Sequence, residues 1–424
     1  MKKYALPFGS SDLAIEIDPR FDVDEIHPVT AKPLNNPELV IWKALENPLS
    51  KEILIDFVGA GFVGIAINDK TRPIPKPNPL PILLDHLDKL GFTKDSIKLF
   101  IGSGTHKPMP KEDYGMILPQ PIIDNYKIIS HDCDKSEMMD LGRTSFGTPI
   151  KVNQEFYSSR LKITVGNIEP HHFMGFSGGV KTAAIGLAGR ETITHNHAML
   201  IDDRARSGTY HSNPLRRDVE EIGKKIGIHF TLGSILEEDK SILGVFFGHP
   251  QAVMDAAIPE VRKIFSVEVP APYNIVIASP GGYPKDINLY QAEKGLTHAA
   301  RITKNGGDVI LVAECSEGSG SPAFEDYIRN AESFQSIIND FSQGFFQIGP
   351  HKAFQIAREA QRVSITLVSD LPSRAVEKWK LRPGKPEEIS SIIKTITANL
   401  QPNSKIAILP AATRTMTEIK NETR

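Results

Sequence analysis

Residues 166–181, GNIEPHHFMGFSGGVK, hold the densest concentration of chemically capable side chains in the chain. The stretch has little helix or strand propensity, and a loop of this length inside a compact domain is usually functional. Glycine-rich backbone can form an anion-binding nest, and imidazole acts as a general acid or base near neutral pH. The residues that we expect to form a site here are His171, His172, Ser177, Gly178, Gly179 and Lys181.

Two shorter segments each follow a predicted strand. In GSGTHKP (102–108) the glycines let the backbone approach a ligand, and His106 could act as a general base. In DKTRP (69–73) Arg72 could present its planar fork to a carboxylate or phosphate, with Asp69 orienting it. The alternatives are an ordinary loop histidine and a solvated surface ion pair.

The segment THNH (194–197) places His195 and His197 two residues apart. On an extended segment both imidazoles face the same way, which is a metal-like spacing. On a helix they diverge, and only one of them can belong to a site.

A further candidate lies in the second half of the chain, in LYQAEK (289–294). At helical spacing Tyr290, Gln291 and Lys294 share one face and could together hold an anion across a cleft between domains. The alternative is an exposed first turn of a helix.

These segments must be positioned by strands and helices of an α/β fold. Short apolar runs alternate with helical patterns, which predicts parallel sheets covered on both faces, with ligands at the carboxyl ends of the strands. The predicted strands are 52–58, 64–68, 97–103, 126–132, 161–167, 274–279, 308–314, 364–370 and 405–411, and the predicted helices are 79–90, 213–226, 286–304 and 386–399.

The length of 424 residues predicts more than one domain. Prolines in SVEVPAPY (266–273) indicate a boundary. We therefore expect an N-terminal catalytic domain over 1–268, a C-terminal α/β domain over 269–400 and an interdomain cleft. We expect the tail, 401–424, to pack back on the N-terminal domain.

Composition excludes several classes of protein. The 49 Lys and Arg nearly balance the 51 Asp and Glu, for a net charge of −2, which argues against a nucleic-acid or anionic-membrane binder. Only Cys133 and Cys315 are present, so a disulfide scaffold or a cysteine-based metal site is not expected. The sequence has no membrane span, and its start is a poor signal peptide, so we expect a cytoplasmic enzyme.

Taken together, the motifs resemble those of a known family. The order D-x-x-R-P, G-S-G-T-H-K-P, P-H-x-F-x-G-F-S-G-G-x-K, a histidine sixteen residues past that lysine, and Y-Q-x-x-K is similar to the nickel-dependent lactate racemase family. The likeness runs over nearly the whole chain, including LPFG at 6–9 and DVILVAECSEGSG in the second half.

The resemblance implies a cofactor and the residues that hold it. The family uses nickel in a pincer group, pyridinium-3,5-bisthiocarboxylic acid mononucleotide. By motif position, Lys181 is expected to tether this cofactor covalently, and His197 to be the protein ligand to nickel. The other residues expected to contact or support the cofactor are Asp69, Thr71, Ser177, Gly178 and Gly179.

The resemblance also implies the reaction. His106 and His171 resemble the paired acid/base residues, and Arg72, Tyr290, Gln291 and Lys294 are expected to bind the substrate. The expected activity is a racemase or epimerase that inverts C2 of a 2-hydroxy acid by reversible hydride transfer to the cofactor, through a 2-keto acid. Cofactor-biosynthesis proteins are the expected partners for loading.

The sequence departs from the family pattern beside the site. Val180 stands where relatives commonly have arginine, and Met174 where a small residue is usual. The substrate therefore stays open between lactate, a larger 2-hydroxy acid and a sugar acid. The resemblance assigns no role to His172 or His195.

Two other functions fit parts of the pattern. A zinc-dependent hydrolase could use His171, His195 and His197 as ligands, although this leaves Lys181 and residues 290–294 unexplained. A non-catalytic nucleotide- or phosphate-binding module could use the glycine-rich loops.

Overall fold

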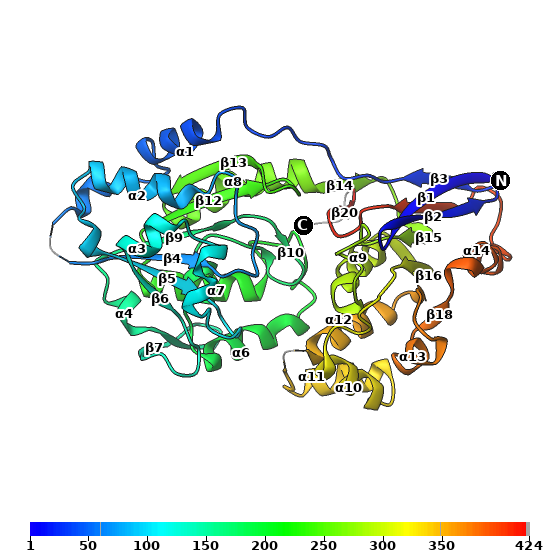
Figure 1. Ribbon diagram of the computed structural model, residues 1–424. Coiled ribbons are helices and arrows are strands. Elements are labelled where there is room, and N and C mark those ends of the chain that lie inside the picture. Colours follow the sequence, from blue (N-terminus) through cyan, green and yellow to red (C-terminus); the bar gives the residue numbers. More distant parts are fainter. Residues whose placement is uncertain (60, 348, 421–424) are drawn as a thin grey trace. The chain divides into compact units, whose positions relative to one another are not determined.

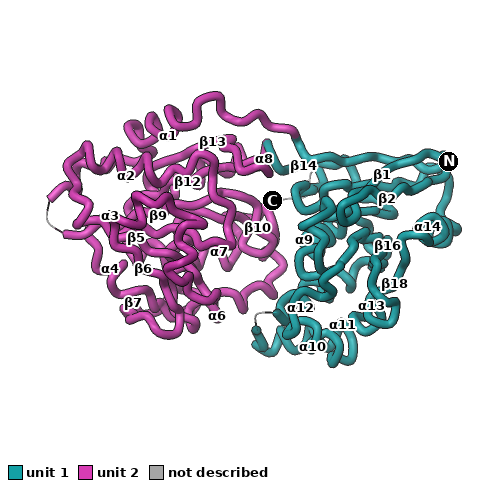
Figure 2. The backbone as a smooth tube through the Cα atoms, in the orientation of Figure 1, with its two compact units in different colours: residues 1–29, 264–424 teal, residues 30–263 magenta. Residues whose placement is uncertain are grey.

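A computed structural model describes residues 1–59, 61–347 and 349–420. The chain folds as two units: residues 30–263 form one, and residues 1–29 with the chain from residue 264 onward form the other (Figure 2). Both units are α/β with a six-stranded sheet (Figure 1), which confirms the predicted fold class. No described helix is long and apolar enough to cross a membrane.

The sheet of unit 30–263 has the order β13-β12-β9-β4-β5-β6. All of its neighbouring pairs are parallel except β12 with β13. Its central strands are continuous apolar runs because both faces are covered. The strands are β4 Val63–Asn68, β5 Ile97–Gly102, β6 Lys127–Ser130, β9 Leu161–Asn167, β12 Phe230–Leu236 and β13 Ile242–Gly248.

Helices and short hairpins surround this sheet. Ile41 of α1 and Leu83 of α2 pack with Ile65 and Ile163 in one apolar core. The opposite face meets α5 so closely that a Cβ on Gly166 would lie 2.8 Å from Thr182 Oγ1. The helices are α1 Pro37–Glu46, α2 Pro79–Lys89, α3 Gln120–Asn125, α4 Gln154–Tyr157, α5 Lys181–Ala184, α6 Arg190–Ala198, α7 Pro214–Ile226 and α8 Pro250–Phe265, and the hairpin strands are β7 Met138–Arg143, β8 Pro149–Asn153, β10 Pro170–His171 and β11 Gly175–Phe176.

The other unit has an all-parallel sheet of order β18-β17-β16-β15-β19-β3. Its strands are β3 Asp22–Glu25, β15 Tyr273–Ala278, β16 Thr303–Val312, β17 Ser364–Val368, β18 Arg382–Gly384 and β19 Lys405–Leu409. The remaining elements are the hairpin β1 Lys2–Phe8 and β2 Ser11–Ile17, the parallel pair β14 Ser266–Val269 and β20 Met416–Ile419, and the helices α9 Leu289–Arg301, α10 Pro322–Asn330, α11 Phe334–Ser342, α12 Pro350–Ala360, α13 Ser373–Lys378 and α14 Ile389–Thr397.

The structure divides the chain differently from the predicted limits at both ends. β3 pairs with β19, so the first 29 residues join the unit that we expected to begin at residue 269. The predicted tail contributes β19 to that same sheet, between β15 and β3, and β20 beside β14. The physical reason is that these strands pair with partners very far away in the sequence. A local sequence pattern carries no information about such pairings.

One predicted strand is wrong. Residues 52–58 contain a 3₁₀ helix, Leu54–Phe57, in place of a strand. The Asp56 carboxylate accepts a hydrogen bond from the backbone N–H of Ile53 at 3.0 Å, and this local bond competes with pairing in a sheet. Ile53 and Ile55 are consequently exposed.

Candidate functional site

The ends of β4 and β5 bring two of the predicted segments together. His106 Nδ1 lies 2.8 Å from Asp69 Oδ2. The other carboxylate oxygen accepts from the backbone N–H of Thr71 at 3.1 Å and from its hydroxyl at 2.6 Å. Asp69 is buried, and burial alone would raise its pKa, but the bonds from His106 and Thr71 outweigh burial and lower the pKa below its ordinary value.

The His106 segment is also joined to the end of α5. Gly104 has a left-handed φ of +55°, and its N–H donates to the carbonyl oxygen of Gly186 at 3.0 Å. A Cβ on Gly102 would lie 2.8 Å from the carbonyl oxygen of Thr182. The glycines therefore permit a close approach of backbones, and His106 is left half exposed at the carboxyl edge of the sheet.

The long loop after β9 contains a short hairpin, with His171 paired opposite Gly175. The His171 and His172 rings are stacked at 4.6 Å, and each meets the Phe173 ring edge-on. The backbone N–H of Met174 donates to His171 Nδ1 at 3.2 Å. In neutral His171 the ring proton therefore resides on Nε2.

Gly178 and Gly179 follow the hairpin with φ values of +83° and +63°. A Cβ on Gly178 would lie 2.8 Å from the carbonyl oxygen of Asn167, and one on Gly179 would lie 2.8 Å from Arg216 Nη2. Ser177 N–H donates to the carbonyl oxygen of Glu169 at 2.8 Å. Only glycine fits this cradle, which leads directly into Lys181.

Lys181 begins α5 and is only partly exposed. Burial of its ammonium group, reinforced by the positive charges of Arg72 and Arg216, holds the pKa of Lys181 well below its ordinary value, against a smaller opposing effect of Glu169. A lysine of lowered pKa carries a larger neutral fraction and is more nucleophilic near neutral pH.

His195 and His197 both lie on α6, so the helical alternative is the one that the structure adopts. Their side chains have different surroundings. His195 Nδ1 lies 2.9 Å from Thr148 Oγ1, whereas the His197 ring meets the Phe173 ring edge-on at 5.2 Å. Burial, together with the nearby Lys181, lowers the pKa of His197 to about 3, so this imidazole is neutral at pH 7.

Helix α7 supplies two anchors that the sequence analysis missed. Asn213, at its N-cap, donates to the carbonyl oxygen of Phe173 at 2.9 Å. The fully buried Arg216 donates to the carbonyl oxygens of Phe176 and Gly178, each at 3.1 Å, and pairs with Glu220. The available signal was a charged residue beside the apolar stripe of 215, 219, 222 and 226.

The candidates in the second half of the chain belong to the other unit, where Asn288 caps α9. Lys294 Nζ donates to Gln291 Oε1 at 2.8 Å, so these two residues share a face as predicted. The Tyr290 ring lies 5.1 Å from Lys352 Nζ of α12. Burial, with a smaller effect of Glu293, raises the pKa of Tyr290.

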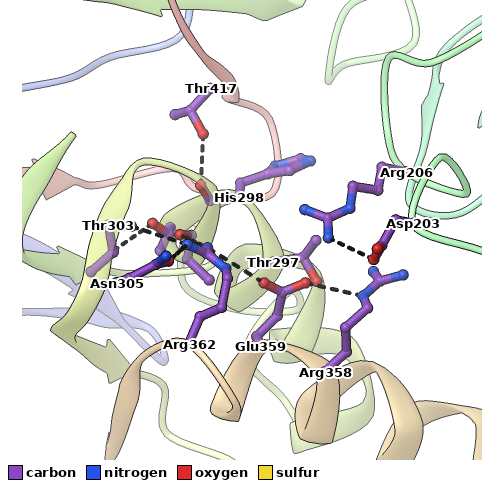
Figure 3. A network of polar contacts seen from close by, with 12 residues as sticks. Asp203, Arg206, Thr297, His298, Thr303, Asn305, Arg358, Glu359, Arg362 and Thr417 are labelled. Atoms are coloured by element: carbon purple, nitrogen blue, oxygen red, sulfur yellow. Dashed lines mark hydrogen bonds and ion pairs between the residues drawn. The ribbon is translucent and has the colours of Figure 1, made fainter. Parts of the chain in front are cut away.

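Polar contacts tie α9 to neighbouring elements of that unit (Figure 3). Arg362 donates to the carbonyl oxygen of Ala300 in α9 at 2.6 Å, and within α12 Arg358 pairs with Glu359 at 3.3 Å. Thr417 of β20 donates to the carbonyl oxygen of His298 at 2.6 Å. Next to this network, Lys352 and Glu293 form a buried ion pair at 2.6 Å. These contacts fix the helix that carries Tyr290, Gln291 and Lys294.

The three histidines of the zinc alternative do not form a ligand set. Over residues 1–59, 61–347 and 349–420, the only group of three or more His, Cys, Asp and Glu residues with ligand atoms within 4.8 Å of one another is Asp132, Cys133 and Asp134. Both Asp134 oxygens accept from Arg190 at 2.6 Å. His195 and His197 lie two positions apart on the helix α6, so their side chains point in different directions and cannot converge on one ion.

The fold and the basic, glycine-lined site are those of a two-domain α/β enzyme. Residues 8–208 match the family described as "Lactate racemase N-terminal domain", and residues 269–416 match "Lactate racemase C-terminal domain". The chain belongs to the lactate racemase family and is an isomerase of the racemase type.

Individual relatives agree over most of the chain. It is 30% identical to lactate racemase of Thermoanaerobacterium thermosaccharolyticum over 97% of this chain and 98% of the relative. It is 31% identical to lactate racemase of Lactiplantibacillus plantarum over 70% of this chain and 71% of that protein. The solved lactate racemase apoprotein of T. thermosaccharolyticum superimposes with a TM-score of 0.89 at 28% identity, covering 98% of this chain and 100% of the other.

A more distant structure shows the fold alone. A Thermotoga maritima protein matches with a TM-score of 0.63 at 19% identity, covering 92% of this chain and 100% of the other.

Proposed function

We propose that this enzyme inverts C2 of a 2-hydroxy acid, using nickel held by a pyridinium-3,5-bisthiocarboxylic acid mononucleotide that is attached to Lys181. The observation that carries the proposal is Lys181 itself. It follows a glycine cradle, its pKa is held well below the ordinary value, and its charge interacts with those of Arg72 and Arg216. A depressed lysine pKa favours covalent attachment, and the basic surroundings favour anions.

The residues present fit this group. Lys181 offers the amine for the tether, and His197 offers a neutral imidazole, the form in which histidine binds a metal. Asp69, Thr71, Ser177, Gly178 and Gly179 are proposed to contact or support the cofactor. When bound, the group would supply a hydride acceptor, which no protein side chain provides.

The two proposed acid/base histidines are prepared for opposite tasks. The Asp69 carboxylate accepts the Nδ1 proton of His106, which leaves Nε2 with a lone pair that can take the substrate hydroxyl proton. His171 accepts at Nδ1 from Met174, so its Nε2 carries a proton. His171 can give this proton to the carbonyl oxygen of the 2-keto acid, which re-forms the hydroxyl of the other enantiomer. In the reverse direction the roles exchange.

Substrate recognition is proposed to rest on the carboxylate. Arg72 can hold it through two parallel hydrogen bonds, and Tyr290, Gln291 and Lys294 would add further donors. The relatives are named lactate racemases, and we propose lactate or a larger 2-hydroxy acid as substrate. Cofactor-biosynthesis proteins are the proposed partners for loading, in the cytoplasm.

Intact-mass measurement on protein produced together with the cofactor pathway tests the tether. Wild-type protein is expected to carry the adduct, and Lys181→Ala to lack it. Lys162→Ala is the matched control, because burial also lowers the pKa of Lys162. An adduct that persists in Lys181→Ala contradicts the assignment.

Racemisation rates test the two histidines separately. His106→Ala and His171→Ala are each expected to lower the rate by about 10²–10⁴-fold while the adduct mass and the fold stay unchanged, because each removes one proton-transfer group. A wild-type rate in either variant removes that residue from the acid/base pair.

A further inference from the structure

The side chain of Asp218, on helix α7, is a buried carboxylate that contacts the neighbouring helix α6. Asp218 has no exposed surface, and three side chains donate hydrogen bonds to it. Thr144 Oγ1 lies 2.5 Å from Oδ1, and Thr148 Oγ1 and Asn196 Nδ2 lie 2.9 Å and 2.8 Å from Oδ2. No ion pair to Asp218 is found within the described ranges of the chain. A buried carboxylate held only by neutral donors is costly and needs an explanation.

The orientation of the Asn196 amide follows from its neighbours. Nδ2 faces both Asp218 Oδ2 and the carbonyl oxygen of Leu215, at 3.1 Å, and a carbonyl oxygen can only accept. The amide therefore presents Oδ1 on its other side, where it lies 3.1 Å from His197 Nδ1. Because this oxygen is also only an acceptor, His197 must be protonated on Nδ1.

This tautomer leaves Nε2 of His197 with its lone pair. A metal-binding histidine typically donates its other ring N–H to a carboxylate, a carbonyl or an amide oxygen, which fixes the ring and its tautomer. The His197 ring also hydrogen-bonds to the backbone of Ile193, one turn earlier on α6.

The same carboxylate reaches the other histidine of α6. Thr148 donates to Asp218 and lies 2.9 Å from His195 Nδ1. Asp218 is thus joined to His195 through Thr148 and to His197 through Asn196, both of which donate to its Oδ2. His195 has a place in this network that the sequence motif did not reveal.

We propose that Asp218 is a positioning residue that acts through Asn196 to fix the His197 ring with Nε2 presented as the ligand atom. The inference rests on the proposed function for the identity of the ligand that His197 binds. The orientation of the ring itself is a property of the protein alone and can be measured without the cofactor.

The first test is ¹⁵N nuclear magnetic resonance of the histidine rings in the full-length protein without cofactor, with the His197 signals assigned from their loss in His197→Gln. Wild type is expected to show His197 protonated on Nδ1. Asn196→Ala and Asp218→Asn are expected to show a mixture of the two tautomers. Thr144→Val is the matched control, because it removes a donor to the other oxygen of Asp218 and leaves the Asn196 bond in place.

The second test is nickel retention by cofactor-loaded protein during dialysis against a chelator. Asn196→Ala and Asp218→Asn are expected to weaken nickel binding about 10–100-fold, the usual effect of losing the partner of a metal-binding histidine. The Lys181 adduct mass should stay unchanged, and Thr144→Val should retain nickel like wild type.

The outcomes separate the two proposals. Nδ1-protonated His197 in both variants, with nickel retained, overturns the role of Asp218, and so does equal nickel loss in Thr144→Val. A loaded wild type that has neither nickel nor adduct contradicts the proposed function instead. In that case the tautomer measurement alone decides whether Asp218 orients His197.

Discussion

At the scale of single residues, neighbouring groups determine which form each ionisable side chain takes. Asp69 is held ionised by His106 and Thr71, and Lys181 is biased toward its neutral form by burial and by Arg72 and Arg216. Both pKa values are lowered, which favours the charged form of Asp69 and the neutral form of Lys181, and both shifts arise from side chains that only folding brings together. Such perturbed pKa values are typical of functional sites.

The contact between Asp69 and His106 predicts how the stability of the protein changes in acid. A carboxyl whose folded pKa lies below its unfolded value stabilises the protein above the unfolded value, about 3.9, and loses this contribution as pH falls through the folded pKa. We expect the unfolding free energy of wild type to fall more steeply below about pH 4 than that of Asp69→Asn. Urea titrations at a series of pH values across this range measure the unfolding free energy of both proteins.

Asp113→Asn is the control for that experiment. It removes a carboxylate that pairs with Lys70 at the surface, where an ion pair contributes little. Its pH profile should follow wild type. If the Asp69→Asn profile also follows wild type, the account of the Asp69–His106 pair is wrong.

At the scale of elements, α7 organises the site without carrying any of the proposed reacting groups. Its residues hold the 170–179 loop through Asn213 and Arg216, and hold α6 through Asp218. The loop has little regular structure of its own, so these bonds from a rigid helix replace the missing backbone pairing.

Glycine substitutions test how tightly this loop is held. A Cβ on Gly175 would lie 1.8 Å from the carbonyl oxygen of Thr209, in a backbone with φ of +78°. We expect Gly175→Ala to cost about 1–3 kcal/mol from overpacking, in addition to about 1–2 kcal/mol for the left-handed backbone. Chemical denaturation measures the difference from wild type.

Gly227 is a matched control at the end of α7. Its φ is +76°, and a Cβ there would meet no atom within 4 Å. Gly227→Ala should therefore show only the backbone cost of about 1–2 kcal/mol. Equal losses of unfolding free energy in Gly175→Ala and Gly227→Ala would mean that the loop moves easily to accept the added Cβ and is not held as described.

Much of the fold could be predicted from local pattern. The apolar runs at 64–68, 97–103 and 161–167 became β4, β5 and β9, and the predicted helix over 213–226 became α7. Buried polar partners could not be predicted in this way. Nothing in the sequence around Asp218 indicates that Asn196 and Thr144 will meet it, because those contacts depend on tertiary packing.

At the scale of the whole molecule, each unit has its own apolar core. The core of unit 30–263 lies around Ile65 and Ile163, and the core of the other unit lies around Ile277 and Ile408. The second unit is built from both ends of the chain, with β3 beside β19. This pairing is why the predicted domain limits differ from the structural units.

Separate cores predict that unfolding is not a single two-state transition. We expect the calorimetric enthalpy of thermal unfolding to exceed the van't Hoff enthalpy, with a ratio between about 1 and 2. Differential scanning calorimetry of the full chain provides both values. A ratio of 1 would show that the two units unfold as one cooperative body.

The proposed reaction is tested most directly by following a single enantiomer of lactate, and of larger 2-hydroxy acids, with cofactor-loaded protein in deuterium oxide. We predict interconversion of the enantiomers with the C2 hydrogen largely retained, because the hydrogen leaves and returns as hydride. Extensive deuterium at C2 would indicate proton abstraction by a side chain. That result, or no interconversion of any acid by protein that carries both nickel and the Lys181 adduct, would contradict the account.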